Sequence, residues 1–273
     1  MLTAVSGPAA AAAAATGAGT DPLTAVLLLL AGIAAGALNA AGGGGTFIAL
    51  PALVAVGLPP VTANATSTVA LLPGALTSTY AYRDRLERVG GTSFTALSVA
   101  SLLGGTVGAV LLLALPPVSF DAAVPWLLAF ATLVLAFGRP LAARLARSRP
   151  EGAPMRPRAV LVAQFLLAIY GGYFGGAVGI LMLAVWAVGL GLDTARGNPM
   201  RVAQLGAVNA VAAAIFLVAA DVLARPVPLL AVLVGAVIGG WGGAHVVKRL
   251  PSGVLRAVVL ITAATMTVLY FLR

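Results

Sequence analysis

An apolar run too long for one straight membrane-spanning helix extends from Leu23 to Gly57. As a single α-helix it would extend roughly 52 Å, whereas the hydrocarbon core of a bilayer is about 30 Å thick. Four consecutive glycines, Gly42 to Gly45, interrupt the run, and Pro51 and Pro59-Pro60 follow. Broken backbone at membrane depth must be buried in protein or line a polar cavity. We therefore interpret the stretch from Asn39 to Ser67 as half of a binding site.

The composition predicts an all-α integral membrane protein. Of 273 residues, 61% are hydrophobic and 8% are charged, whereas soluble domains contain about 25% charged residues. The net charge of +9 comes from arginines in short loops between apolar segments, so we expect a lipid bilayer as partner and no nucleic acid. Cysteine is absent, which excludes disulfides and thiolate sites. We interpret the single histidine, His245, as an interfacial residue and expect no metal site.

The apolar segments divide the chain into two halves with about eight transmembrane elements in total. In each half the first element is too long for one span, and the second such element, Ala159 to Leu190, again contains glycines at its centre. An internal repeat is the economical explanation. The expected organisation is a disordered Ala-rich tail, a first membrane repeat, a basic cytoplasmic connector and a second membrane repeat, at residues 1–22, 23–138, 139–158 and 159–273.

Positive charge favours an inverted orientation of the two repeats. If each broken element turns back on itself, nearly all the loop arginines and Lys248 fall on one side, opposite Arg225 and Arg273. If each broken element crosses once, the basic loops divide less unevenly. The positive-inside rule favours the first arrangement, with both termini outside. The sequence leaves open whether the broken elements are re-entrant hairpins or kinked spans.

Matching patterns in the two broken regions predict the site. Gly43-Gly44 matches Gly175-Gly176, and Ala63-Asn64 matches Gly197-Asn198. In each half an asparagine is expected to open the next helix, so that two helix N-termini converge. A helix N-terminus carries about half a positive charge and several unpaired N–H donors, which makes a pair of them an anion site.

Polar side chains around these breaks complete the candidate site. The guanidinium of Arg201 is planar with five donors and suits a carboxylate or another oxyanion. The candidate substrate-binding residues are Asn39, Gly43, Gly44, Thr46, Asn64, Thr66, Ser67, Gly175, Gly176, Asn198, Arg201 and Asn209.

Several of these residues also have a purely structural explanation. Asn64 and Asn198 are good helix caps, and the hydroxyls of residues 66 to 68 can bond back to their own helix. Arg201 could be a cytoplasmic anchor and Asn209 an interhelical hydrogen-bonding group, while Gln204 fits either role. Small-residue spacing predicts close helix packing at Gly104 and Gly108. Along Gly235, Gly239 and Gly243 it fits packing within one chain or between the protomers of a homo-oligomer.

Two segments resemble the paired signatures of the sulfite exporter TauE/SafE family of membrane permeases. Residues 35–74 read AGALNAAGGGGTFIALPALVAVGLPPVTANATSTVALLPG, and residues 169–209 read IYGGYFGGAVGILMLAVWAVGLGLDTARGNPMRVAQLGAVN. The resemblance implies a bacterial inner-membrane transporter of sulfur-containing anions such as sulfite or organosulfonates, with no cofactor. Arg201 stands where the second signature often has lysine, which keeps the positive charge.

The leading functional hypothesis is an anion permease that works by alternating access between the repeats. Another small anion, such as a carboxylate, and a non-transporting structural or assembly subunit are the alternatives. We do not expect an enzyme, because the broken segments contain no His, Asp or Glu before Asp193. The acidic residues all lie at or outside the ends of the apolar segments. The substrate, transport direction, coupling ion and oligomeric state are not predicted.

Overall fold

A computed structural model of the chain describes residues 21–42, 44–86, 89, 91–147, 155–190, 192, 194–247 and 252–272. Within these ranges the chain is helical, apart from short connections and an isolated bridge between Val89 and Thr92. Four helices are long and apolar enough to cross a membrane, and shorter apolar helices accompany them. The expectation of an all-α membrane protein is confirmed.

The long apolar elements divide into separate helices. The first half contains α2 (Pro22–Gly42), α3 (Thr46–Ala55), α4 (Pro60–Ala81), the short η1 (Arg83–Arg85), α5 (Phe94–Ala114) and α6 (Pro117–Arg147). The second half contains α7 (Pro157–Tyr173), α8 (Val178–Leu190), α9 (Thr194–Ala219), the short η2 (Val222–Ala224), α10 (Pro226–Val247) and α11 (Ser252–Phe271). Both expected breaks are present: one lies at the glycine run and the other near Gly175.

The first broken element turns back on itself. A Cβ built on Gly45 would lie 2.6 Å from the carbonyl oxygen of Ala35. In a continuous helix these two residues would be about 15 Å apart. Helix α3 therefore returns alongside α2, and α2 with α3 forms a hairpin.

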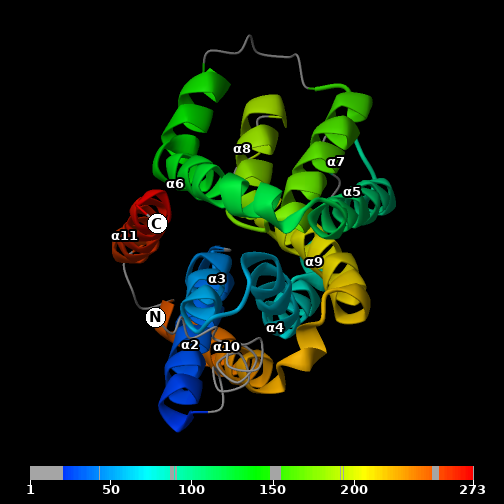
Figure 1. Cartoon of the computed structure of the whole chain (residues 1–273). Coiled ribbons are helices and arrows are strands. Elements are labelled where there is room, and N and C mark those ends of the chain that lie inside the picture. Colours follow the sequence, from blue (N-terminus) through cyan, green and yellow to red (C-terminus); the bar gives the residue numbers. More distant parts are fainter. Residues whose placement is uncertain are drawn as a thin grey trace, which may run out of the picture.

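The second broken element is also a hairpin. The backbone N–H of Met155, just before α7, donates to the carbonyl of Gly189 near the end of α8, with an N–O distance of 2.8 Å. The turn contains Gly175 and Ala177 with positive φ angles of 81° and 59°, and the glycine adopts this conformation without steric cost. Figure 1 shows α7 and α8 side by side.

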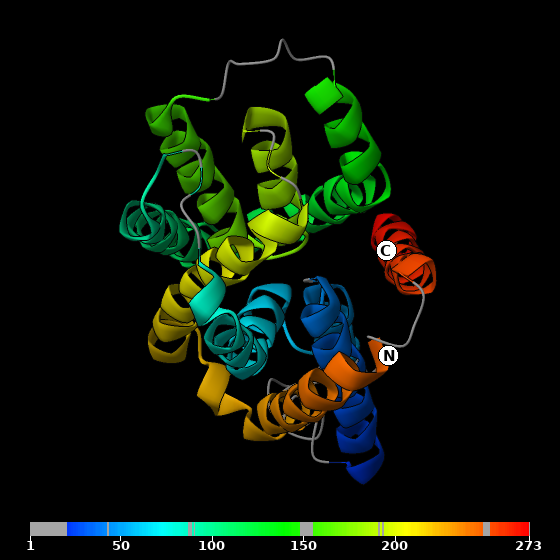
Figure 2. The same cartoon turned by 180° about the vertical axis from the view of Figure 1, so that it is seen from behind.

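The two halves exchange a helix. In Figures 1 and 2, α2, α3, α4 and α10 gather in one lobe, while α5, α7 and α8 gather in the other. Helix α10 of the second half packs along α2 of the first half, and α5 of the first half packs along α7 of the second. Helix α9 contacts α4 of the first lobe and α5 of the other, and α6 contacts α11. Each hairpin is therefore completed by a helix from the opposite half.

Small residues allow these exchanged helices to approach closely. A Cβ at Gly104 would lie 2.5 Å from the carbonyl oxygen of Phe165 on α7, and one at Gly108 would collide with the carbonyl of Ile169. On α10, added Cβ atoms at Gly235 and Gly239 would collide with the α2 carbonyls of Leu29 and Ile33, respectively. Both glycine pairs thus pack within the chain, as was expected for the pair on α5.

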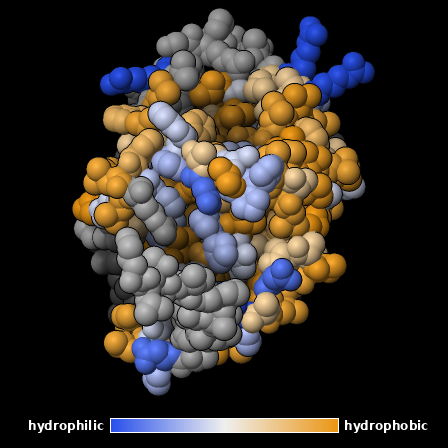
Figure 3. Space-filling model, viewed as in Figure 1, coloured by the Kyte–Doolittle hydropathy of each residue, from blue (hydrophilic) through white to orange (hydrophobic). Residues whose placement is uncertain are grey.

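The outer surface is predominantly apolar. Many large hydrophobic side chains on the outer faces are exposed, including Trp126, Val218 and Trp241. Figure 3 shows a hydrophobic surface with a strip of hydrophilic residues through the middle of that face. This distribution suits helices surrounded by lipid, with polar groups collected between the lobes.

A matched pair of substitutions on α10 tests this packing. Gly239→Ala places a methyl group against the backbone of Ile33, and we expect it to lower the free energy of unfolding by about 1–3 kcal/mol. Gly242→Ala is the control, because an added Cβ there meets nothing within 4 Å. Thermal unfolding in detergent should separate the two, and equal midpoints would contradict the close α2–α10 contact.

Candidate functional site

The two hairpin turns meet at the centre of the molecule. A Cβ built on Gly175 would lie 3.6 Å from the hydroxyl oxygen of Thr46, so the glycine turn of one half lies beside that of the other. A cavity of about 20 Å³ lies where they meet. It is lined by Asn39, Gly44, Thr46, Thr68, Leu71, Gly175, Ala177, Val178, Gly179, Leu205 and Asn209.

A larger cavity lies beside the first, between α2, α4 and α9. Its volume is about 110 Å³, and Asn39 and Leu205 line both cavities. Its lining consists of Asn39, Ala75, Ser78, Tyr82, Asn198, Arg201, Val202 and Leu205. Ser78 and Tyr82 lie near the C-terminal end of α4, so this cavity extends from the central turns toward η1, which begins at Arg83.

Arg201 is buried at the wall of the larger cavity. The residue is 6% exposed, and its Nε donates to the side-chain oxygen of Asn198 over 2.9 Å. Gly179 of α8 leaves the space that the guanidinium occupies, because a Cβ there would lie 2.6 Å from Nη1. Among the described residues that line the two cavities there is no carboxylate. A buried cation in such surroundings favours an anionic ligand.

The helix N-termini at the centre belong to α3 and α8. Gly44 and Thr46 at the start of α3, and Val178 and Gly179 at the start of α8, line the smaller cavity. The N–H groups of Phe47, Ile48 and Ile180 donate to carbonyls one turn earlier, so only the N–H groups before them at each helix start can face an anion. Both positive ends of these short return helices therefore point into the site.

The expectation that α4 and α9 supply these N-termini is wrong. Helix α4 begins after the exposed Pro59, and α9 begins at Thr194, upstream of the exposed Arg196. The return helices α3 and α8 start at the centre and run outward, so the helices that follow them begin away from the cavities. α4 and α9 contribute residues from within the helix instead.

Neither asparagine caps its helix. Asn64 lies in the second turn of α4, whose N-cap is Pro59, and Asn198 lies within α9. The Asn64 side-chain amide donates to the carbonyl of Tyr173 at the end of α7, with an N–O distance of 3.0 Å. Asn64 thus ties α4 to the second hairpin, while Asn198 orients Arg201.

The threonines and serine after Asn64 lie away from the two cavities, except for Thr68. The hydroxyls of Ser67 and Thr68 donate to the carbonyl of Asn64 over 2.9 and 3.0 Å, as their structural alternative predicted. Thr66 is buried, and its hydroxyl has no hydrogen-bond partner among the described residues. The hydroxyls of Ser67 and Thr68 are therefore used within α4 itself.

The structure brings together seven of the twelve candidate residues around the two cavities. These are Asn39, Gly44, Thr46, Gly175, Asn198, Arg201 and Asn209. It places Asn64, Thr66 and Ser67 elsewhere on α4, and Gly176 against the ring of Phe174. Gly43 and the side chain of His245 lie outside the described residues.

Sequence reasoning missed Ser78 and Tyr82 on α4 as lining residues. They follow Ala75 at helical spacing, so these three residues share one face of α4 and line the cavity together. This spacing is the signal in the sequence that could have identified Ser78 and Tyr82. Gly179 is one of several glycines in the second broken element, and no pattern in the sequence indicates that it faces Arg201.

Gln204 has the structural one of its two possible roles, because it belongs to a buried polar network. The hydroxyl of Ser101 on α5 donates to the Gln204 side-chain oxygen and accepts from the Gln164 amide of α7, each over 2.8 Å. All three side chains are fully buried. The network ties α9 to α5 and α7, and because Arg201 lies one turn earlier on α9, it fixes the backbone that holds the guanidinium.

Asn64→Ala tests the tie between α4 and the second hairpin. The change leaves the Tyr173 carbonyl without its amide donor, and we expect a loss of about 1–3 kcal/mol in unfolding free energy. Ser67→Ala, which removes a bond within α4 only, is the matched control and should cost about 1 kcal/mol or less. Chemical or thermal unfolding measures both, and an equal loss in the two variants would contradict the interhelical role.

Comparison with known proteins gives one family and one curated relative. A family model described as "Sulfite exporter TauE/SafE" matches residues 27–270. A "Probable membrane transporter protein" from Haemophilus influenzae is 26% identical over 242 residues, which cover 88% of this chain and 92% of that protein. No solved structure matches the chain significantly.

Proposed function

The chain belongs to the TauE/SafE sulfite exporter family, and on this basis we propose that it carries small sulfur-containing oxyanions, such as sulfite or organosulfonates, across the bacterial inner membrane. The family and the apolar helices make it a multi-pass membrane protein of a permease family. The observation that carries the anion assignment is the buried Arg201 at the wall of a central cavity whose described lining lacks a carboxylate.

The donors around the cavities suit an oxyanion. Arg201 offers directed N–H groups, and the N-terminal turns of α3 and α8 add backbone donors and positive dipole ends. The Asn39 amide lines both cavities and the Thr46 hydroxyl lines the smaller one. An oxyanion has several acceptor oxygens and therefore suits a site that offers a guanidinium together with neutral N–H and O–H donors.

The size of the cavity limits the substrate. A volume of about 110 Å³ is well below the roughly 300–1,000 Å³ of pockets for drug-sized ligands. An occupant with only a few non-hydrogen atoms fits this space.

Alternating access would use the two hairpins as the moving parts. The site lies where the turns of α2–α3 and α7–α8 meet, and α4 and α9 cross beside it. Rocking of one lobe against the other would open the site to alternate sides. If both broken elements turn back, the basic loops gather on one side, which the positive-inside rule makes the cytoplasmic side. The end of the larger cavity near Tyr82 and Arg83 would then face the cytoplasm.

Arg201→Ala tests the anion site directly. In proteoliposomes loaded with radiolabelled sulfite, we expect transport to fall about tenfold or more, because a charge-assisted interaction is worth about 1.5–3 kcal/mol. Arg196→Ala is the matched control, since this arginine lies on the same helix, is exposed and lines neither cavity. Arg201→Lys should retain part of the rate. Unchanged transport by Arg201→Ala would contradict the assignment.

Gly179→Ala tests the position of the guanidinium without removing it. The added Cβ would lie 2.6 Å from Arg201 Nη1, so the guanidinium must move. We expect a severalfold rise in the KM for anion transport, with protein yield and fold retained. An unaltered KM would show that the position of the Arg201 guanidinium against α8 does not affect anion binding.

A further inference from the structure

A large apolar groove lies between α6 and α8, separate from the central cavities. Its volume is about 660 Å³. Its walls consist of Phe130, Leu133, Val134, Phe137, Gly138, Leu141, Met155, Leu181, Ala184, Val185, Val188 and Gly189. None of these side chains carries a charge or a hydroxyl, so the groove offers a bound molecule apolar contact alone.

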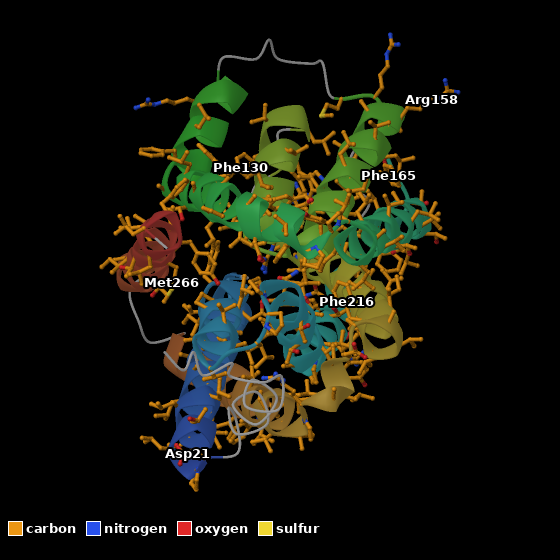
Figure 4. The ribbon with its side chains drawn as sticks, viewed as in Figure 1. Asp21, Phe130, Arg158, Phe165, Phe216 and Met266 are labelled. Carbon is orange, nitrogen blue, oxygen red and sulfur yellow. The ribbon has the colours of Figure 1, made fainter. Side chains whose placement is uncertain are left out.

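The groove opens on the lipid-facing side of the protein. Leu133, Phe137 and Leu141 follow one another along α6 and are 57%, 60% and 54% exposed, respectively. Phe130, labelled in Figure 4, begins this row and is also exposed. A hydrocarbon chain from the bilayer can therefore enter the groove from the side and fill a space too apolar to hold water well.

Arginines mark one end of the groove. On α6, Arg144 follows the lining residue Leu141 by about one turn and is exposed. On the other wall, exposed Arg156 follows Met155, whose N–H bonds to the carbonyl of Gly189 and so holds it at the end of α8. Arg158 projects from the same end of the molecule in Figure 4.

We propose that the groove binds an anionic phospholipid of the surrounding bilayer, with an acyl chain between α6 and α8 and the phosphate at Arg144 and Arg156. The apolar walls select the chain, and the positive end selects a headgroup with net negative charge over a zwitterionic one. Anionic lipids are drawn to basic residues at the cytoplasmic surface, the side on which the positive-inside rule puts these arginines. The proposal does not depend on the transported substrate.

Lipid titrations of the delipidated protein in neutral detergent test this site. We compare dioleoyl phosphatidylglycerol with dioleoyl phosphatidylcholine, following the thermal midpoint and counting retained lipids by native mass spectrometry. The wild type should bind phosphatidylglycerol more tightly. The double variant R144Q/R156Q should weaken that binding about thirtyfold, the effect of removing two arginines at a membrane surface, without changing phosphatidylcholine binding.

Two further variants locate the effect. Ala184→Trp fills the groove on the α8 wall and should weaken binding of both lipids, while Arg83→Gln, in η1 after α4, should change neither. Equal affinity of the wild type for the two lipids would overturn the proposal. An undiminished preference for phosphatidylglycerol in R144Q/R156Q would also overturn the proposal. Both of these outcomes can be read even if Ala184→Trp does not fold.

Discussion

The rest of the structure depends on the need to bury interrupted backbone inside a bilayer. A chain that breaks its helices at glycine within hydrocarbon exposes N–H and C=O groups that lipid cannot satisfy. Here each break is the turn of a hairpin, and the two turns face each other at the centre, with Thr46 beside Gly175. One requirement thus accounts for both the burial of the breaks and the position of the polar cavities.

Close packing of exchanged helices holds the hairpins in place. Helices α10 and α5 each lie along the hairpin of the opposite half, where glycines allow backbone contact. A polar network through Gln164, Ser101 and Gln204 adds a further tie to α9. These contacts hold the helix that carries Arg201 against Gly179 of α8. The burial of the guanidinium follows from packing at the two hairpins.

Much of the fold and part of the site could be predicted from the sequence. Apolar length and glycine position were enough for the all-α class and for both breaks, and Arg201 and Asn39 do line the cavity. The sequence did not reveal which helix ends meet, because that depends on the hairpins turning back. Asn64 was assigned to the site from its match with Asn198, yet it bonds to the end of α7. Local pattern does not specify partners that lie far apart in sequence.

The most direct test of the anion site is thermal stabilisation of the purified protein by a panel of anions. Sulfite, sulfate, thiosulfate, sulfoacetate and acetate, together with the zwitterionic sulfonate taurine, would be compared on the wild type and on Arg201→Ala. A ligand at about 100 times its Kd stabilises the native state by about 2.7 kcal/mol. The account predicts a higher midpoint with at least one sulfur oxyanion for the wild type and none for the variant. The same shift in both proteins, or no shift with any anion, would contradict it.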